Sequence, residues 1–243
     1  MLPIIHLDGN PFPMYGLMAI AGGVFAGVVA LVKRRAFSLR VRDVLLLFTF
    51  ATIGAMVGAR LFGVIGHMFK HGGEPGFWTA ESLLRAFNSG GGVFYGGLLG
   101  GIGLAVAWAK IGHIDLKSMF DAAAYVGLAF QSIGRLGCYF AGCCYGIVLA
   151  SGAHFPVQLL EAGFCFAALL AFLIVRPERR WPKLPLFPVY IITYAVGRFI
   201  LEFLRGDANR GVWILSTSQW IGLALIALAV VWLRKSKHCA RED

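Results

Sequence analysis

The segment Gln131-Ser-Ile-Gly-Arg-Leu-Gly-Cys-Tyr-Phe-Ala-Gly-Cys-Cys-Tyr-Gly146 places a permanently charged side chain inside an apolar, helix-like run. Arg135 has no acidic neighbour in this segment, and a guanidinium at membrane depth is costly unless its charge is compensated. Cysteines and glycines follow it closely, which is unlike a plain lipid-facing helix. The segment therefore predicts that a packing partner or a substrate supplies negative charge here.

The composition around this segment indicates a membrane protein. The chain has 243 residues, of which 58% are hydrophobic and 14% are charged, whereas soluble domains are roughly 45–50% apolar and about 25% charged. A single membrane domain over residues 1–243 is expected, with no room for a second large domain. The net charge of +10 does not predict a nucleic-acid partner, because the basic residues cluster in short loops between apolar stretches.

Seven apolar stretches predict an all-α integral membrane protein with seven transmembrane helices. Each stretch is near the ~20 residues that a helix needs to cross a bilayer core. They cover residues 15–32, 43–66, 92–110, 118–139, 157–175, 184–204 and 212–233.

The basic residues also predict the orientation. Most of the 22 Lys and Arg residues follow the first, third, fifth and seventh stretches. The positive-inside rule then places the N-terminus outside and the C-terminus in the cytoplasm. The longest loop, at about 67–91, would lie on the outer face, and its segment Glu81-Ser-Leu-Leu-Arg-Ala-Phe has helical spacing. That helix could lie along the membrane surface or be an ordinary surface helix.

In this orientation, the polar residues of the spans all fall in the outer half of the membrane. Arg198, Glu202 and Arg205 have the spacing of one helix face, which also includes Tyr194. Arginines outnumber glutamates in the set, which favours an anionic ligand such as a phospholipid headgroup. An Arg198–Glu202 pair that only joins helices is the alternative. The full set is Tyr15, Arg60, Tyr95, Arg135, Gln158, Glu161, Arg198, Glu202 and Arg205.

The glycine-rich segment Gly90–Gly101 allows two interpretations: close helix packing, or backbone that lines a cavity. Tyr95 in its centre is either an interface anchor or a hydroxyl of the site.

The outer cysteines leave several roles open. Cys138 could form a disulfide with Cys143 or Cys144, or one thiolate near Arg135 could be a nucleophile. The three thiols with His154 could hold a metal, and small buried thiols are the remaining alternative. Of these roles we favour small buried thiols or a disulfide, so we expect no metal and no cofactor. No HExxH sequence or phosphate-binding glycine loop is present.

Seven short segments then follow one another in a definite order. They are Met14-Tyr-Gly-Leu-Met18, Gly58-Ala-Arg60, Val93-Phe-Tyr-Gly-Gly-Leu98, Gly134-Arg-Leu-Gly137, Pro156-Val-Gln-Leu-Leu-Glu161, Gly197-Arg-Phe-Ile-Leu-Glu-Phe-Leu-Arg205 and Ser218-Gln219. In this order and spacing they resemble the prolipoprotein diacylglyceryl transferase family over nearly the whole chain.

The resemblance implies an enzyme that moves the diacylglyceryl group of phosphatidylglycerol onto the lipobox cysteine thiol of a secreted prolipoprotein and releases glycerol phosphate. It implies a multi-pass protein of the bacterial cytoplasmic (inner) membrane, surrounded by membrane lipids, with its active site toward the outer face. The catalytic residues that it implies are Arg135, Arg198, Glu202 and Tyr95. The substrate-binding residues that it implies are Tyr15, Arg60, Gly96, Gly97, Gln158, Glu161 and Arg205.

The chain departs from the family pattern at several positions. Tyr95 stands where the family usually has a histidine before Gly-Gly-Leu, and Cys138, Ala141 and Cys143 replace two amides and a carboxylate. One alternative is therefore a diverged enzyme of the same scaffold that uses its outer cysteines or another acceptor. A non-enzymatic lipid-binding or transport protein is a further alternative, although the inner halves of the spans are almost purely apolar.

Overall fold

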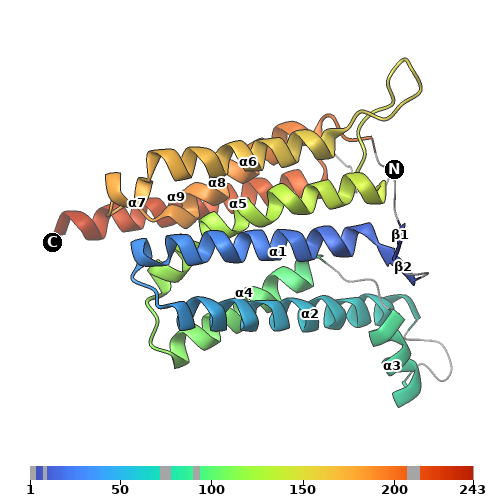
Figure 1. The fold of residues 1–243 in the computed structure, drawn as a ribbon, viewed down its shortest axis with the longest axis horizontal. Coiled ribbons are helices and arrows are strands. Elements are labelled where there is room, and N and C mark those ends of the chain that lie inside the picture. Colours follow the sequence, from blue (N-terminus) through green and yellow to red (C-terminus); the bar gives the residue numbers. More distant parts are fainter. Residues whose placement is uncertain (1–3, 8–9, 72–77, 90–93, 207–213, 243) are drawn as a thin grey trace. The chain divides into compact units, whose positions relative to one another are not determined.

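The computed structural model describes residues 4–7, 10–71, 78–89, 94–206 and 214–242 (Figure 1). Each of the seven predicted apolar stretches contains a long helix, so the predicted helices are confirmed. These helices are α1 (Met14–Lys33), α2 (Val41–His71), α4 (Phe94–Ile111), α5 (Leu116–Ala141), α6 (Val157–Val175), α8 (Leu186–Glu202) and α9 (Thr217–Glu242).

Short elements complete the described chain. The helices η1 (Arg34–Phe37) and α7 (Pro177–Arg180) are single turns, and α3 (Ala80–Ser89) confirms a helix in the loop at 67–91. Residues 72–77 and 90–91 of that loop lie outside the described residues.

The described chain is otherwise helical, as predicted, and a short antiparallel pair of strands precedes α1. The strands β1 (Ile4–Leu7) and β2 (Asn10–Pro13) pair with Ile4 opposite Pro13. Pro11 and Pro13 disfavour the helical conformation in the residues before them, which keeps β2 extended. Helix α1 begins directly after Pro13.

Four of the described helices are long and apolar enough to cross a membrane. They are Met14–Phe37, Val41–Phe69, Val157–Arg180 and Thr217–Ser236. The apolar helix Tyr95–Ile111 is shorter. The seven-span topology and the outward N-terminus therefore stay predictions.

The chain divides into two compact units. One comprises Met1–Ser38 with Phe120–Asp243, and the other comprises Leu39–Met119. The single membrane domain over residues 1–243 stays a prediction.

In the unit Leu39–Met119, α2 and α4 approach each other at glycines. A methyl group on Gly58 would overlap the carbonyl oxygen of Gly96, and one on Gly96 would lie 2.6 Å from that of Gly58. Gly54 and Gly100 meet in the same way one turn along. Small residues four apart let membrane helices pack backbone to backbone. The close-packing interpretation therefore holds for the described glycines of Gly90–Gly101.

In the other unit, α5 is the helix against which the neighbours pack. A methyl group on Gly137 of α5 would lie 2.9 Å from Met18 Cβ of α1. A methyl group on Gly127 would lie 2.6 Å from the hydroxyl of Tyr190 on α8. Figure 1 shows α1, α5, α6 and α8 of this unit running lengthwise beside one another. The lack of side chains at these two positions of α5 sets how closely α1 and α8 approach it.

Helix α8 receives its N-terminal cap from α5. Asp121 is buried, and its Oδ1 accepts hydrogen bonds from the backbone nitrogens of Leu186 at 2.6 Å and Phe187 at 3.2 Å. The residue that precedes α8 is Pro185, which offers no capping side chain. The carboxylate of α5 therefore satisfies the first backbone donors of α8 and fixes the two helices together.

Helix α9 begins with a capping box. The backbone nitrogen of Ser216 donates to Gln219 Oε1 at 2.9 Å, and the backbone nitrogen of Gln219 donates to Ser216 Oγ at 3.3 Å. Gln219 Nε2 also donates to the carbonyl of Phe199 on α8 at 3.3 Å. The family-like Ser218-Gln219 segment therefore places a structural glutamine at this helix start.

The connection between α5 and α6, residues 142–156, is attached to the end of α8. Gly146 pairs with Arg205 in an antiparallel bridge, and the backbone nitrogen of Ile147 donates to Leu204 O at 3.0 Å. The chain that carries the cysteines is thereby held beside the arginine that follows α8.

Candidate functional site

Glu161, on the second turn of α6, joins arginines from two other helices. Only 2% of its surface is exposed. Its Oε1 lies 2.9 Å from Nη2 of Arg135 on α5, and its Oε2 lies 3.1 Å from Nη1 of Arg198 on α8. A charged carboxylate removed from water is costly unless its charge is compensated, and these guanidinium groups supply that compensation.

A second carboxylate extends this arrangement along α8. Nη2 of Arg198 lies 2.7 Å from Oε2 of Glu202, and Nη1 of Arg205 lies 3.5 Å from the same oxygen. The shared face predicted for these three residues is confirmed. Glu202 is 2% exposed and Arg198 is 9% exposed, so this pairing is largely removed from solvent.

The five charged side chains form one continuous chain of ion pairs, which we call the arginine–glutamate chain. Its order is Arg135, Glu161, Arg198, Glu202 and Arg205. The mutual Arg198–Glu202 pairing that the sequence left open is present, so these arginines are compensated in part by protein carboxylates. Arg60, which we counted with them, belongs to the other unit. The five side chains carry three positive and two negative charges, one positive charge in excess.

Tyr194 is a member of the site that we did not include among the site residues. Its hydroxyl donates to Oε1 of Glu161 at 3.1 Å and accepts from Nη2 of Arg135 at 3.2 Å. Tyr194 lies one turn before Arg198 on the same face of α8, and that spacing was the available signal.

Gln158 lies one turn before Glu161 and connects the site to the cysteine loop. It is 1% exposed, and its Nε2 donates to the carbonyl of Cys143 at 2.8 Å. Its Oε1 has no hydrogen-bond partner among the described residues. A buried acceptor in this state is costly, and it is suited to accept a hydrogen bond from a ligand.

Tyr15, at the start of α1, belongs to the same region. Its Cδ2 would lie 3.5 Å from a methyl group on Gly137. It also lies close enough to Arg135, Cys138 and Cys143 to interact with them electrostatically.

The remaining predicted site residues lie in the other unit, Leu39–Met119. Nη1 of Arg60 donates to a backbone carbonyl of α3 at 3.1 Å. Tyr95 is in the first turn of α4, and Gly96 and Gly97 pack against α2. Their place in one site with Arg135 stays a prediction.

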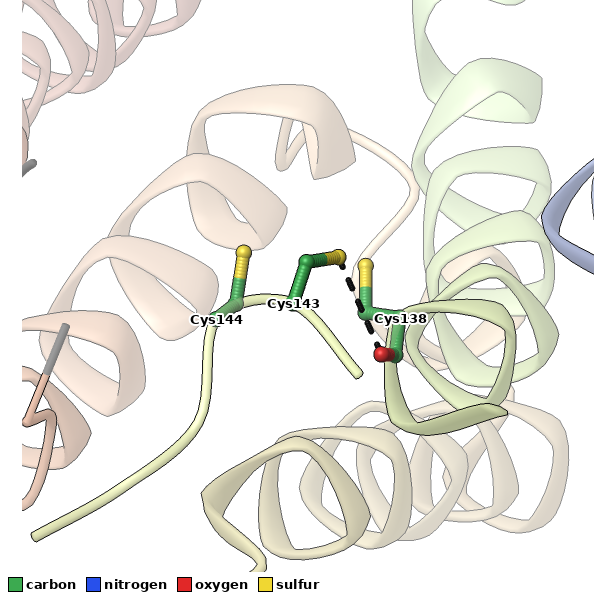
Figure 2. Close-up of side chains that lie close together, drawn as sticks. All are labelled: Cys138, Cys143 and Cys144. Carbon is green, nitrogen blue, oxygen red and sulfur yellow. Dashed lines mark hydrogen bonds between the residues drawn. The ribbon is translucent and has the colours of Figure 1, made fainter. Parts of the chain in front are cut away.

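The end of α5 brings two cysteines together. Gly142 has a left-handed conformation with φ 73°, its backbone nitrogen donates to Tyr139 O, and that of Cys143 donates to Cys138 O, both at 3.2 Å. These two bonds form a Schellman motif, which ends the helix and turns the chain back. Cys143 Sγ then lies 3.7 Å from Cys138 O (Figure 2).

Cys144 completes a cluster of three thiols, which we call the thiol cluster. The Sγ atoms of Cys138, Cys143 and Cys144 all lie within 4.8 Å of one another. The three are free thiols, so the disulfide considered above is not formed. His154 packs against the ring of Tyr145 at a centroid distance of 4.2 Å and is not a member of this cluster.

The two loop thiols of the cluster differ in their electrostatic surroundings. A hydrogen bond from the Cys138 thiol is the main cause that lowers the pKa of Cys144 to about 6; burial opposes this shift, and the positive charges of Arg205 and Arg135 add to it. Burial, followed by the neighbouring Cys144, raises the pKa of Cys143. The arginines of the site therefore favour a thiolate at Cys144.

Comparison with known proteins gives one consistent result. A family model described as prolipoprotein diacylglyceryl transferase matches residues 3–234. A protein of Clostridium tetani named phosphatidylglycerol–prolipoprotein diacylglyceryl transferase is 32% identical over 248 residues, which cover 95% of this chain and 96% of the relative.

Two further relatives carry corresponding names. The phosphatidylglycerol–prolipoprotein diacylglyceryl transferase 2 of Clostridium perfringens is 29% identical, over 94% of this chain and 93% of the relative. The phosphatidylglycerol–prolipoprotein diacylglyceryl transferase of Gloeobacter violaceus is 28% identical, over 99% of this chain and 94% of the relative. The similarity therefore extends over nearly the full length of these proteins rather than over one motif.

Proposed function

Since this chain belongs to the prolipoprotein diacylglyceryl transferase family, a family of transferases, we propose that it moves the diacylglyceryl group of phosphatidylglycerol onto the lipobox cysteine of prolipoproteins. The reaction takes place at the outer face of the bacterial cytoplasmic membrane and releases glycerol phosphate. The observation that carries the proposal is the buried arginine–glutamate chain, in which Glu161 holds Arg135 and Arg198 together.

In the proposed complex, Arg135 and Arg198 bind the phosphate of the lipid headgroup. Each guanidinium has five N–H donors, and the ion pairs engage Nη2 of Arg135 and both terminal nitrogens of Arg198. The other donors remain for phosphate oxygens. In a site shielded from water, these positive charges stabilise the negative charge that develops on the departing phosphate.

The transfer itself is a displacement at carbon. The acceptor thiolate attacks the glycerol carbon that carries the phosphate ester, a C–S bond forms, and the C–O bond breaks with its electron pair leaving on the phosphate. The thiol proton passes to a base, and by family resemblance Tyr95 occupies that position. Tyr95→Phe, which removes the hydroxyl, should then slow transfer relative to the wild-type protein. Tyr95→His, which supplies the family's usual base, should transfer faster than Tyr95→Phe.

The surrounding residues position the substrates. Gln158 Oε1 is a buried acceptor suited to a hydroxyl of the headgroup. Tyr15 lies near Arg135, Arg205 pairs with Glu202, and Glu202 orients Arg198. By resemblance, Arg60, Gly96 and Gly97 are also substrate-binding residues.

A reconstituted assay tests this proposal. Purified full-length protein in detergent is mixed with phosphatidylglycerol and a lipobox peptide, and mass spectrometry follows the diacylglyceryl thioether. Phosphatidylethanolamine in place of phosphatidylglycerol is the lipid control. We expect product only with phosphatidylglycerol, and a folded protein that gives no thioether would contradict the proposal.

Matched arginine variants test the site. Arg135→Ala removes a guanidinium from the arginine–glutamate chain and should lower the transfer rate by at least about 100-fold, as the loss of about 2.7 kcal/mol of transition-state stabilisation does. Arg179→Ala removes an exposed guanidinium from α7 and should keep the rate. Equal rates for the two variants would refute the role of Arg135.

A further inference from the structure

The thiol cluster is a concentration of ligating atoms that the proposed transfer does not use (Figure 2). The Sγ atoms of Cys138, Cys143 and Cys144 lie within 4.8 Å of one another. In a tetrahedral zinc site with Zn–S bonds of about 2.3 Å, ligand sulfurs lie about 3.8 Å apart. Movements of about one ångström would therefore bring these three sulfurs to ligand distances.

The backbone, rather than chance contact, creates this convergence. The Schellman motif at Gly142 returns Cys143 to the last turn of α5, where Cys138 lies. Cys144 then has φ 57°, a left-handed conformation that a residue with a Cβ adopts at a cost. Such local strain persists where the surrounding structure enforces it, and it is common at binding sites.

The surroundings of the cluster are also those of a binding site. Cys138 is buried, Cys144 is intermediate and Cys143 is exposed, so the cluster is anchored on one side and reachable from the other. The buried amide of Gln158 holds the carbonyl of Cys143 at 2.8 Å. A hydrogen bond that fixes a residue whose side chain ligates a metal helps to orient the ligand atom.

A bound metal ion would offset most of the negative charge that three thiolates carry. Three thiolates with a divalent ion carry a net charge of −1, and with a monovalent ion −2. Arg205 and Arg135 act electrostatically on Cys144 and lower the cost of that negative charge. A disulfide explains the three converging thiols less well than a metal ion does. A bond between the adjacent Cys143 and Cys144 is strained, and any disulfide would leave the third thiol unused.

We propose that Cys138, Cys143 and Cys144 bind one thiophilic metal ion, Zn²⁺ or Cu⁺, through three thiolates. Each thiol that ligates releases its proton to solvent, and no oxidation or reduction takes part. Bound metal would fix the connection 142–156 against the end of α5 in place of the polar side chains that the family pattern has there.

Metal content tests the proposal independently of transferase activity. Full-length protein purified in detergent after incubation with Zn²⁺, or with Cu⁺ under reductant, is desalted and analysed by elemental mass spectrometry. We expect about one ion per chain. The incubation in which the ion is retained shows whether the site prefers Zn²⁺ or Cu⁺. Cys143→Ser, which replaces the exposed thiol, should reduce retention at least tenfold. Cys165→Ser, which replaces a buried thiol outside the cluster, should not.

Thiol labelling of the wild-type protein supplies a test that needs no variant. Membranes are treated with a maleimide at lysis, with or without prior chelator or reductant, and labelled cysteines are counted by mass. For a metal site, labelling of the cluster rises after chelator alone. Labelling that rises only after reductant shows a disulfide, and full labelling without treatment shows empty thiols; either result overturns the proposal, as does equal metal loss in Cys143→Ser and Cys165→Ser.

Discussion

Glu161 is the residue through which three side chains of the site hold their positions. It bonds Arg135, Arg198 and Tyr194 while almost wholly buried. Its neutralisation would leave two guanidinium groups without their shared counter-charge, which is more costly than the loss of an exposed pair.

Glu161→Gln should therefore affect both stability and transfer. We expect a loss of about 3 kcal/mol of unfolding free energy and a transfer rate at least tenfold lower per folded molecule. Glu178→Gln is the matched control, because the Glu178 side chain is only 6% exposed and pairs with Lys33 at 2.9 Å, away from the site. It should lose stability and keep its rate. Thermal unfolding and the thioether assay measure the two effects, and an unchanged rate in Glu161→Gln would be the contrary result.

Asp115 gives a residue-scale prediction about pH. Its Oδ2 accepts from the backbone nitrogen of Ser118 at 2.8 Å and caps α5. Hydrogen bonds from the backbone and side chain of Ser118 lower the pKa of Asp115 below its usual value of 3.8. The carboxylate thus stabilises the fold above the unfolded-state pKa, and this contribution is lost as the pH falls through the lower folded-state pKa.

Asp115→Ala should lower the stability by about 1 kcal/mol at neutral pH, the usual value of an N-cap. This difference should shrink on acidification. Asp115→Asn retains a capping oxygen that does not titrate, so it should stay near wild type at neutral pH and lose less on acidification. Thermal unfolding midpoints measured between neutral pH and pH 3 test this prediction. An equal loss of stability on acidification in Asp115→Asn and in the wild-type protein would contradict it.

At the scale of elements, the glycines of α2 are not equivalent. Gly58 faces the backbone of α4, whereas nothing lies within 4 Å of a methyl group built on Gly66. Gly58→Ala should cost about 1–3 kcal/mol, as overpacking does, whereas Gly66→Ala should be neutral or stabilising by up to about 1 kcal/mol. Thermal unfolding in detergent compares the two, and equal midpoints would disprove the close helix contact.

The helices themselves could be predicted from the sequence, because apolar stretches of membrane-spanning length leave few alternatives. The details at their ends could not. The strand pair before α1 depends on prolines that disfavour helix, and the cap that Asp121 supplies to α8 joins two elements distant in the chain. The clustering of Cys143 with Cys138 depends on a left-handed Gly142, which the spacing of the cysteines does not reveal.

The site was predictable to a similar degree. Spacing along α8 indicated that Arg198, Glu202 and Arg205 share a face. It could not indicate that Glu161 of α6 lies between Arg135 and Arg198, because that contact depends on how three helices pack.

At the scale of the whole molecule, the orientation in the membrane is open to a direct test. In a chain whose five cysteines are replaced by serine, Ser151→Cys and Ser38→Cys each introduce one exposed thiol in place of a serine. The outward N-terminus places residue 151 outside and residue 38 in the cytoplasm. An impermeant maleimide should label the first in intact cells and the second only after lysis. The reverse result would invert the topology.

The backbone pairing of Gly146 with Arg205 would couple the two proposed binding events to one another. A lipid phosphate bound by Arg205 would act through this pairing on the segment that carries Cys143 and Cys144, and a metal ion bound by those sulfurs would restrain Arg205 in turn. Thermodynamic linkage makes this coupling reciprocal: whatever factor the ion imposes on lipid affinity, the lipid imposes on ion affinity. Metal supply in the cell would then be a variable of lipoprotein maturation.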